Sequence, residues 1–217
     1  MIKIDKSEEP ICLEELRNSP EPKIDYFSLQ GDCLKEVRGK LNSDQKGLCA
    51  YCQRKFQSII FIEHYIPRAD EGQGKALELQ YSNFHGVCSG KYYVDRKTGK
   101  AILFCSVERG SKTLTINPES QFDIDTLFYD GESRIKSTNS VFQNELDNIL
   151  NLNFDDLCLD RQISLEEEIN PILEMAITLE LTPLETFTKA RNSVLARNPE
   201  FLGYLLYRLN ELITYHS

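Results

Sequence analysis

Four cysteines between residues 49 and 105 have the types and spacing of a zinc site. Cys49 and Cys52 have two residues between them, and this spacing lets one tight turn aim both sulfurs at a single ion. Cys88 and Cys105 can supply the second pair of thiolates, although sixteen residues separate them. The spacing therefore predicts a structural Zn²⁺ bound by four thiolates. The alternative is that one or both of the later cysteines are ordinary buried thiols.

An acid–histidine pair lies between the two pairs of cysteines. His64 has an unperturbed pKa of about 6.5, so it can accept a proton from water near neutral pH. Glu63 can hold a catalytic divalent ion, Mg²⁺ or Mn²⁺, against a departing phosphate. Asn83 can orient the histidine loop or the metal. These residues predict cleavage of a phosphodiester bond, and the competing interpretation is a surface Glu-His pair with a turn asparagine.

Basic residues are concentrated in the same part of the chain. The whole chain has a net charge of −9, but residues 48–118 carry ten Lys/Arg against six Asp/Glu, and residues 119–217 carry seven against eighteen. Phosphate binding depends on local positive charge, so nucleic acid remains a candidate ligand. The candidate contacts are Arg68, His85, Lys97, Arg109 and Lys112. His85 could instead be a third ligand or support the site from behind, and each cation alone could be a solvated surface residue.

The composition is that of an ordinary globular protein. It is 41% apolar and 27% charged over 217 residues, without an apolar run that approaches the roughly 20 residues of a membrane span. The N-terminus is too charged for a signal peptide, so we expect a cytoplasmic protein with no membrane partner. In that compartment the seven cysteines are better explained as metal ligands and buried thiols than as disulfides. Cys12, Cys33 and Cys158 are then structural or incidental.

Periodicity and turn residues predict the elements that position these groups. Residues 1–24 contain three prolines and should be extended or loosely ordered, and a helix is expected over about 32–41. Strands are expected at 58–63, where the strand delivers Glu63 and His64, and at 113–118. A hairpin is expected around Asp130-Gly131, because Asp-Gly supplies the positive φ angles of a tight turn.

The rest of the chain has helical periodicity. Helices should begin near residue 141, beyond residue 155, at a capping box formed by Ser164 and Glu167, at Pro183 and after Pro199. The expected architecture is α+β. It comprises an N-terminal extension and helix (1–47), a small zinc-stapled core (48–118) and a mainly helical region (119–217). The acidic helical region is the candidate for docking a partner.

Several motifs together resemble a known class of enzyme. They are Cys-Ala-Tyr-Cys (49–52), Ile-Glu-His-Tyr-Ile-Pro-Arg (62–68), Tyr-Ser-Asn (81–83) and Leu-Thr-Ile-Asn-Pro (114–118). The set resembles the HNH endonucleases of bacterial anti-phage defence systems, especially the PtuB-like subunits of Septu and of related retron-associated systems. The similarity continues through residues 135–139 and 150–153.

This resemblance implies a fold, a reaction and partners. The fold would be a ββα-metal nuclease core that cleaves DNA, with His64 activating water and Glu63 binding the catalytic ion. The partner would be an ABC or SMC-like ATPase (PtuA-like), and in a retron setting a reverse transcriptase with its DNA–RNA product would join the assembly.

The chain departs from this family at one position. Relatives often have His-Cys-Asp at the last cysteine, whereas this chain has Phe104-Cys105-Ser106. Ser106 would bind a divalent ion poorly, and Glu108 or His85 could substitute. The main prediction is a metal-dependent HNH DNA endonuclease. The alternative is a zinc-stapled adaptor with a degraded nuclease site that regulates the ATPase.

Overall fold

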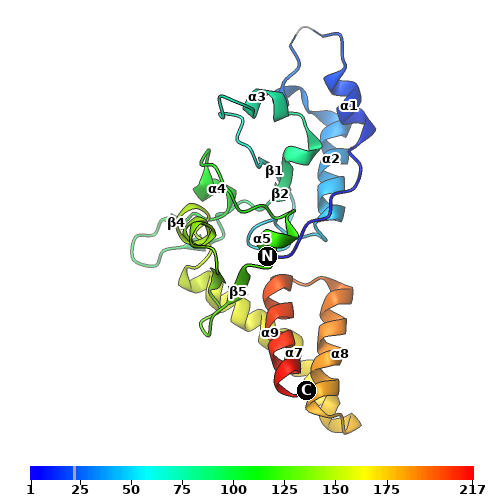
Figure 1. The fold of residues 1–217 in the computed structure, drawn as a ribbon, viewed down its shortest axis with the longest axis vertical. Helices are drawn as coiled ribbons and strands as arrows, with labels where there is room; N and C mark the ends of the chain where they lie inside the picture. The colour runs from blue at the N-terminus through cyan, green and yellow to red at the C-terminus, as the bar shows by residue number, and fades with distance from the viewer. Residues whose placement is uncertain (22) are drawn as a thin grey trace.

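The computed structural model describes residues 1–21 and 23–217 of the chain. The molecule is elongated (Figure 1). At one end lie helices α1 (Ile11–Arg17), α2 (Gly31–Asp44) and α3 (Gly74–Leu77) with strands β1 (Phe61–His64) and β2 (Phe84–Val87), and at the other lie helices α7 (Asp155–Leu179), α8 (Pro183–Arg197) and α9 (Leu202–Tyr215). The described residues contain three separate two-stranded sheets. This arrangement confirms the predicted α+β class.

The first part of the chain builds the end that carries the histidine. Its elements are α1 (Ile11–Arg17), the 3-10 helix η1 (Tyr26–Ser28), α2 (Gly31–Asp44), β1 (Phe61–His64), α3 (Gly74–Leu77), the 3-10 helix η2 (Tyr81–Asn83) and β2 (Phe84–Val87). Helix α2 confirms the predicted helix, and its Val37 and Leu41 are fully buried in a small core beneath the hairpin. The strand predicted at 58–63 begins three residues later.

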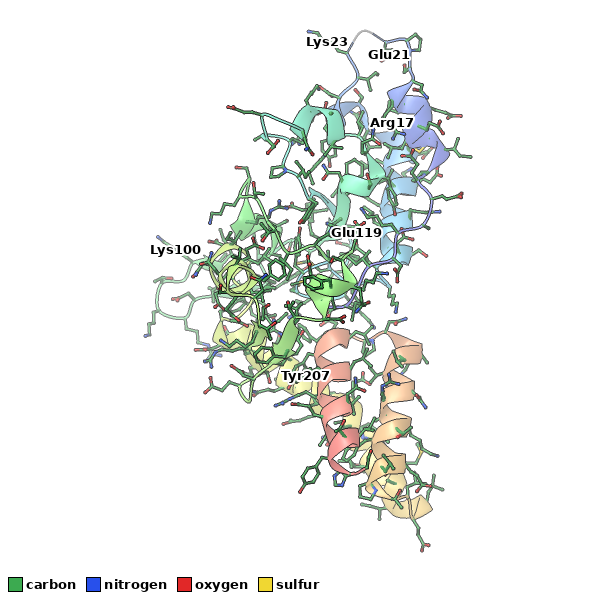
Figure 2. All side chains as sticks on the ribbon, viewed as in Figure 1. Arg17, Glu21, Lys23, Lys100, Glu119 and Tyr207 are labelled. Carbon is green, nitrogen blue, oxygen red and sulfur yellow. A yellow bond between two sulfur atoms is a disulfide. The ribbon has the colours of Figure 1, made fainter. Side chains whose placement is uncertain are left out.

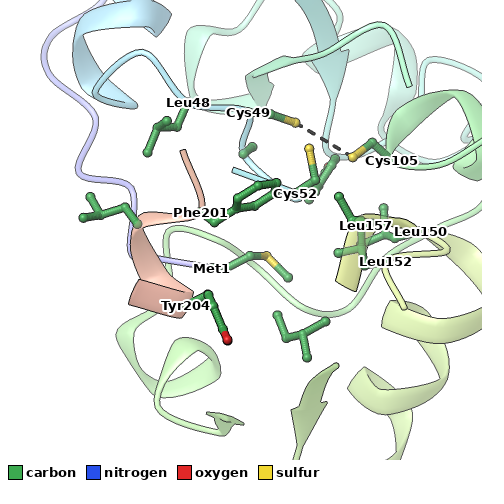
Figure 3. Close-up of a cluster of buried hydrophobic side chains, with 14 of the residues drawn as sticks. Met1, Leu48, Cys49, Cys52, Cys105, Leu150, Leu152, Leu157, Phe201 and Tyr204 are labelled. Carbon is green, nitrogen blue, oxygen red and sulfur yellow. Dashed lines mark hydrogen bonds between the residues drawn. The ribbon is translucent and has the colours of Figure 1, made fainter. Parts of the chain in front are cut away.

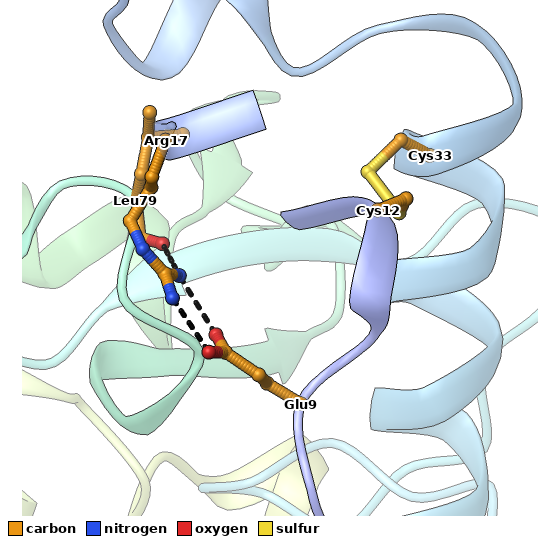
Figure 4. Close-up of a disulfide and its surroundings, with 5 residues drawn as sticks. All are labelled: Glu9, Cys12, Arg17, Cys33 and Leu79. Carbon is orange, nitrogen blue, oxygen red and sulfur yellow. Dashed lines mark hydrogen bonds and ion pairs between the residues drawn. A yellow bond between two sulfur atoms is a disulfide. The ribbon is translucent and has the colours of Figure 1, made fainter. Parts of the chain in front are cut away.

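The N-terminal segment is more ordered than its prolines indicate. The prediction of an extended or loose chain over residues 1–24 is wrong for 11–17, where Pro10 precedes α1 and Leu13 is fully buried. Arg17 at the end of α1 donates to both carboxylate oxygens of Glu9 and to the carbonyl of Leu79 (Figure 4). A bidentate ion pair and one apolar anchor thus fix this short helix.

A disulfide joins α1 to α2. Cys12 and Cys33 are bonded, with their Cα atoms 5.6 Å apart (Figure 4). For Cys12 and Cys33, this bond corrects the expectation that the cysteines of this chain are metal ligands and buried thiols rather than disulfides. That expectation failed because α1 was not predicted, so nothing in the sequence placed Cys12 beside Cys33.

Loss of this disulfide should destabilise the protein by about 2–4 kcal/mol, because the crosslink restricts the unfolded chain over a separation of 21 residues. Urea unfolding with and without a phosphine reductant measures the effect. The double variant Cys12→Ser/Cys33→Ser is the control, since reductant should not change its midpoint. Identical unfolding of the wild-type protein in both conditions would contradict the bond.

The hairpin β1–β2 places the candidate catalytic residues in register. The strands are antiparallel, with Glu63 opposite His85 and His64 opposite Phe84. Directly opposed residues share one face of an antiparallel pair, so Glu63 and His85 project to the same side. A second hairpin, β3 (Tyr93–Val94) with β4 (Ala101–Ile102), follows and leads to α4 (Ser106–Arg109).

Residues 113–118 do not form the predicted strand. Instead, the backbone N–H groups of Thr115 and Ile116 donate to the buried carboxylate of Glu145, at 2.8 and 2.9 Å. Side-chain oxygens therefore replace a strand partner, which the β-rich composition of the segment could not reveal. The hairpin predicted around Asp130-Gly131 is confirmed by β5 (Leu127–Tyr129) and β6 (Ile135–Ser137), but the positive φ of its turn is at Ser133 (62°) and not at Asp130 or Gly131.

Helices dominate the remainder. They are α5 (Gln121–Ile124), α6 (Ser140–Asn144), the π-helical turn η3 (Glu145–Ile149), α7 (Asp155–Leu179), α8 (Pro183–Arg197) and α9 (Leu202–Tyr215). The predicted start at Pro183 is confirmed, with Thr182 and Glu185 forming the capping box. The predicted start at Ser164 is wrong, because α7 continues through it and buries Leu157 and Ile169 on either side.

One apolar core connects the cysteines to the helical region. Phe201 and Tyr204 belong to one buried cluster with Met1, Leu157 and Cys52, and Figure 3 shows Phe201 beside Cys52 and Tyr204 beside Met1. Gln53, within the cysteine turn, accepts the N–H of Phe201 through its carbonyl (2.9 Å) and the N–H of Gly203 through Oε1 (2.8 Å). Among the described helices, none is long and apolar enough to cross a bilayer.

Candidate metal centre and active site

Four buried thiols converge as the sequence predicts. The sulfurs of Cys49, Cys52, Cys88 and Cys105 all lie within 4.8 Å of one another. Sγ of Cys49 is 3.9 Å from Sγ of Cys105, and Sγ of Cys52 is 3.7 Å from Sγ of Cys88. Ligands about 2.3 Å from a tetrahedral ion are about 3.8 Å apart, so the donor set and its dimensions fit Zn²⁺.

Local backbone geometry brings the distant cysteines together. In the first turn, Gln53 has a φ of 62° and donates its N–H to the carbonyl of Cys49 at 3.1 Å. The β3–β4 hairpin occupies the gap between Cys88 and Cys105, and its base is closed by Gly90. A Cβ at Gly90 would lie 2.3 Å from the carbonyl oxygen of Phe104, so only glycine permits this approach. The long spacing is therefore an insertion that leaves the ligand geometry intact.

The pKa shifts of the thiols differ: burial raises the pKa of Cys52 and of Cys105 well above the usual thiol value, whereas the pKa of Cys49 is lowered toward the ligand form. Burial raises the pKa of Cys49, but hydrogen bonds from Cys105, Cys52 and Cys88 outweigh it and hold the pKa well below the usual thiol value. A thiolate is the form that binds zinc, and binding at a buried site contributes directly to folding. The centre can therefore hold the N-terminal part and the helical region in one structure.

His64 lies at the end of β1, and one of its two ring nitrogens forms a hydrogen bond. Nε2 is 3.0 Å from the carbonyl oxygen of Glu78 and must donate to it, which fixes the tautomer with the proton on Nε2. Within the described residues Nδ1 has no hydrogen-bond partner, and it is not among the atoms sealed from solvent. Burial lowers the pKa of His64 below 6.5. The imidazole is therefore neutral at pH 7, with a free lone pair on Nδ1.

A cavity of about 410 Å³ opens beside this histidine. Its walls include the side chains of Tyr26, Glu63, His64 and Arg68, together with Gly110 and Ser111 after α4. The edge of the Tyr26 ring packs on the His64 ring, with centroids 4.7 Å apart. The cavity thus combines a neutral base and an exposed guanidinium in a space large enough for a phosphate group.

Asn83 fixes the loop that follows His64. Its Oδ1 accepts the N–H of Ile66 at 2.7 Å, and its Nδ2 donates to the carbonyls of Ile66 at 3.1 Å and Leu77 at 3.3 Å. The side chain is buried. Of the two roles considered for Asn83, these contacts are those of a residue that orients the histidine loop.

Glu63 is held by a buried arginine. Nη1 of Arg109 donates to Oε1 of Glu63 at 2.5 Å and to the carbonyl of His64 at 3.1 Å, while Nη2 donates to the carbonyl of Tyr65 at 2.5 Å. Nε donates to the carbonyl of Lys112 at 2.8 Å. Burial raises the pKa of Glu63 to about 7, although the ion pair with Arg109 opposes this shift.

These contacts do not fit the catalytic divalent ion that the family resemblance implies. Arg109 occupies an oxygen of Glu63 and adds a positive charge beside it. Ser106 offers only a neutral hydroxyl, and within the described residues only the four cysteines form a group of three or more possible ligands. Neither Glu108 nor His85 joins Glu63 in such a group. The residues around Glu63 and His64 therefore do not form a site for a catalytic divalent ion.

Substitution of Arg109 by methionine should destabilise the protein by up to about 3 kcal/mol, because it leaves the carboxylate of Glu63, whose side chain is only 15% exposed, without its partner. The loss should shrink as the pH falls toward about 7 and level off below it, since without Arg109 the carboxyl of Glu63 takes up a proton at a higher pH than it does in the wild-type protein. Urea unfolding at several pH values measures both effects. The double variant Glu63→Gln/Arg109→Met is the matched control and should recover part of the loss. A penalty that grows on acidification would contradict this role.

Of the five predicted nucleic-acid contacts, three are exposed and two are not. Arg68 lies on the cavity wall, and Lys112 comes directly after Ser111, which also lines the cavity. Lys97 lies in the β3–β4 turn, and its neighbour Lys100 is at the outer edge of the molecule (Figure 2). Arg109 is 1% exposed, so the prediction that it contacts phosphate is corrected to a structural role.

His85 is also corrected. It is fully buried, and its Nε2 donates to Oε1 of Glu119 at 2.9 Å, so it cannot contact a phosphate on the surface. Burial lowers the pKa of His85, which keeps the ring neutral. Glu119 also pairs with Lys6 at 2.9 Å, which makes His85 part of a buried network between the hairpin and the N-terminal segment.

Two aromatic residues beside Arg68 of the cavity wall were not predicted from the sequence. Tyr26 and Phe27 lie in η1, which Asp25 caps by accepting the N–H of Phe27 at 2.9 Å. The guanidinium carbon of Arg68 lies 4.6 Å from the centroid of the Tyr26 ring and 5.0 Å from that of Phe27. The only local signal was an aromatic pair in a polar segment, and nothing in the sequence connects it to His64.

Comparisons with known proteins give no name to this site. No model of a protein family matches the chain. No curated protein matches it with significant similarity.

Proposed function

We propose that this protein is a nuclease of the HNH kind that hydrolyses phosphodiester bonds of DNA with His64 as the general base. The observation that carries the proposal is the state of His64. Its Nε2 is fixed by a carbonyl, its Nδ1 is unpaired, its lowered pKa keeps it neutral, and it lines a cavity shared with Arg68. A water molecule in the cavity can give its proton to Nδ1 as its oxygen attacks phosphorus; the P–O bond to one deoxyribose oxygen then breaks, and that oxygen leaves and takes a proton from solvent.

The surrounding residues have complementary roles in this proposal. Arg68 pairs with the phosphate oxygens, because a guanidinium matches their geometry and charge. Asn83 and Arg109 hold the backbone on either side of His64, which keeps the base in position. The β1–β2 hairpin followed by α4 supports a ββα arrangement, since Arg109 of α4 binds directly to Glu63 and His64 of β1. An ATPase partner remains a prediction from the family resemblance.

The test is cleavage of plasmid DNA and single-stranded circular DNA by the purified protein, in Mg²⁺, in Mn²⁺ and in EDTA. We expect the wild-type protein to cut and His64→Ala to fail. His216→Ala is the matched control, because His216 is exposed near the C-terminus and should be dispensable. Zinc content is measured in every sample so that loss of the structural ion is not mistaken for loss of a catalytic one. Equal cutting by wild type and His64→Ala would exclude His64 as the base.

A zinc-stapled adaptor is the second candidate. The observation in its favour is the ion pair between Glu63 and Arg109, with Ser106 at the position where a metal ligand is expected. An adaptor would bind one zinc per chain and form a complex with its partner ATPase, yet neither wild type nor His64→Ala would cut DNA under any of these conditions. That pattern would favour the adaptor over the nuclease.

A further inference from the structure

An exposed aromatic side chain, Phe27, lies beside Arg68, which forms part of the wall of the cavity. Phe27 is 67% exposed, and it lies in a segment whose other aromatic residue, Tyr26, forms part of the cavity wall. The two rings meet edge to face with centroids 6.1 Å apart. A single exposed apolar residue is common on protein surfaces, so the position of Phe27 beside Arg68, rather than its exposure alone, makes it a candidate for contact with a ligand.

The segment that presents Phe27 is held in place. The side chain of Asp25 accepts the N–H of Phe27, and the side chain of Ser28 accepts the N–H of Asp25, which forms a capping box around η1. The disulfide between Cys12 and Cys33 closes the chain on both sides of it. Phe27 is therefore exposed on an ordered support.

Arg68 connects this ring to the cavity. Its guanidinium lies over both Phe27 and Tyr26, and the same residue lines the cavity with His64. A cation and an aromatic face side by side suit a nucleotide, whose phosphate takes the cation and whose base stacks on the ring. In a duplex the faces of each base are covered by its neighbours, so only an unpaired or extruded nucleotide offers a free face.

We infer that the site takes single-stranded DNA, with an unpaired base stacked on Phe27 while the adjacent phosphate lies between Arg68 and His64. This inference rests on the proposed nuclease function and names its substrate class. It assigns Phe27 a role in specificity, because stacking accepts any base and depends on strandedness rather than on sequence.

The test is the equilibrium binding of three fluorescent ligands without divalent ions: a short oligothymidylate, a duplex of equal length, and an abasic strand of equal length that keeps the phosphates and lacks the bases. We expect oligothymidylate to bind best. Phe27→Ala should weaken its binding by about 5- to 150-fold, as loss of one stacked base predicts, and should leave the abasic strand unaffected. Phe27→Trp should bind at least as tightly as the wild type.

Phe122→Ala is the matched control, because Phe122 is also exposed (79%) but belongs to α5, whereas the guanidinium of Arg68 lies over the rings of Tyr26 and Phe27. It should bind all three ligands as the wild type does. Unchanged oligothymidylate binding in Phe27→Ala, equal affinity for the abasic strand and oligothymidylate, or preference for the duplex would each overturn the inference.

The two proposals fail in different ways. Cleavage of duplex DNA that needs His64 but not Phe27 would remove single-strand specificity and leave the nuclease. Phe27-dependent binding of single strands without any cleavage would remove the nuclease and leave a single-strand binding site. Absence of binding to all three ligands would overturn both.

Discussion

Replacement of Cys105 by serine should release zinc and unfold the centre of the protein. A structural zinc site contributes roughly 10–16 kcal/mol of apparent binding free energy, which equals or exceeds the roughly 5–15 kcal/mol of net stability of a typical domain. Cys105 is buried beside Cys49, and its backbone N–H donates to the carbonyl of Leu150 at 2.8 Å. Loss of the ligand therefore disturbs the cysteine turn and the start of the helical region together.

Zinc per chain, thermal unfolding and circular dichroism measure this effect. Cys158→Ser is the matched control, since Cys158 is a buried free thiol outside the four-cysteine cluster. The control should keep one zinc per chain and most of its stability, whereas Cys105→Ser should bind substantially less zinc and lose its cooperative transition. Two results would exclude a structural metal centre: wild-type protein that contains no zinc after purification, or a Cys105→Ser variant that unfolds like the control.

The second large effect is expected on catalysis. Removal of a general base typically slows a reaction by about 10²- to 10⁴-fold, so His64→Ala should reduce the rate of DNA cleavage by that factor. Burial lowers the pKa of His64 below 6.5, and only the neutral ring accepts a proton. The wild-type rate should therefore be constant at neutral and mildly alkaline pH and should fall as the pH drops through this lowered pKa.

Single-turnover cleavage rates across this pH range provide the measurement. In His64→Ala the residual rate should no longer fall at low pH (the acidic limb of the pH profile), because the imidazole that takes up the proton is absent. His216→Ala should retain both the rate and the limb. An acidic limb that persists unchanged in His64→Ala would assign the titration to another group, with Glu63 the first candidate because its pKa is raised to about 7.

Local signals in the sequence were sufficient for several elements. Cys49 and Cys52 form half of the centre because a turn is a local structure, and the hairpin around Asp130-Gly131 forms for the same reason. The start of α8 follows from Thr182 and Pro183 alone. In each case the residues that determine the structure are within a few positions of one another.

Long-range packing determined what the sequence could not reveal. The pairing of Cys12 with Cys33 requires α1, a short helix stabilised by contacts with Glu9 and Leu79. A surface arginine and a buried one look alike in sequence, so Arg109 was assigned to phosphate instead of to Glu63. Capping residues at Ser164 were overridden because a continuous α7 buries more apolar surface.

The bonds from Gln53 to the start of α9 have a mechanical consequence. The same residue closes the cysteine turn, so α9 is attached to the metal centre through a buried side chain and two hydrogen bonds rather than through a flexible linker. A force applied to α9 would therefore reach the cysteine turn directly. The backbone N–H of Ala50, in the same turn, donates to the carbonyl of Gly86 in β2 at 3.1 Å, so direct contacts link α9 through this turn to the hairpin that carries His64.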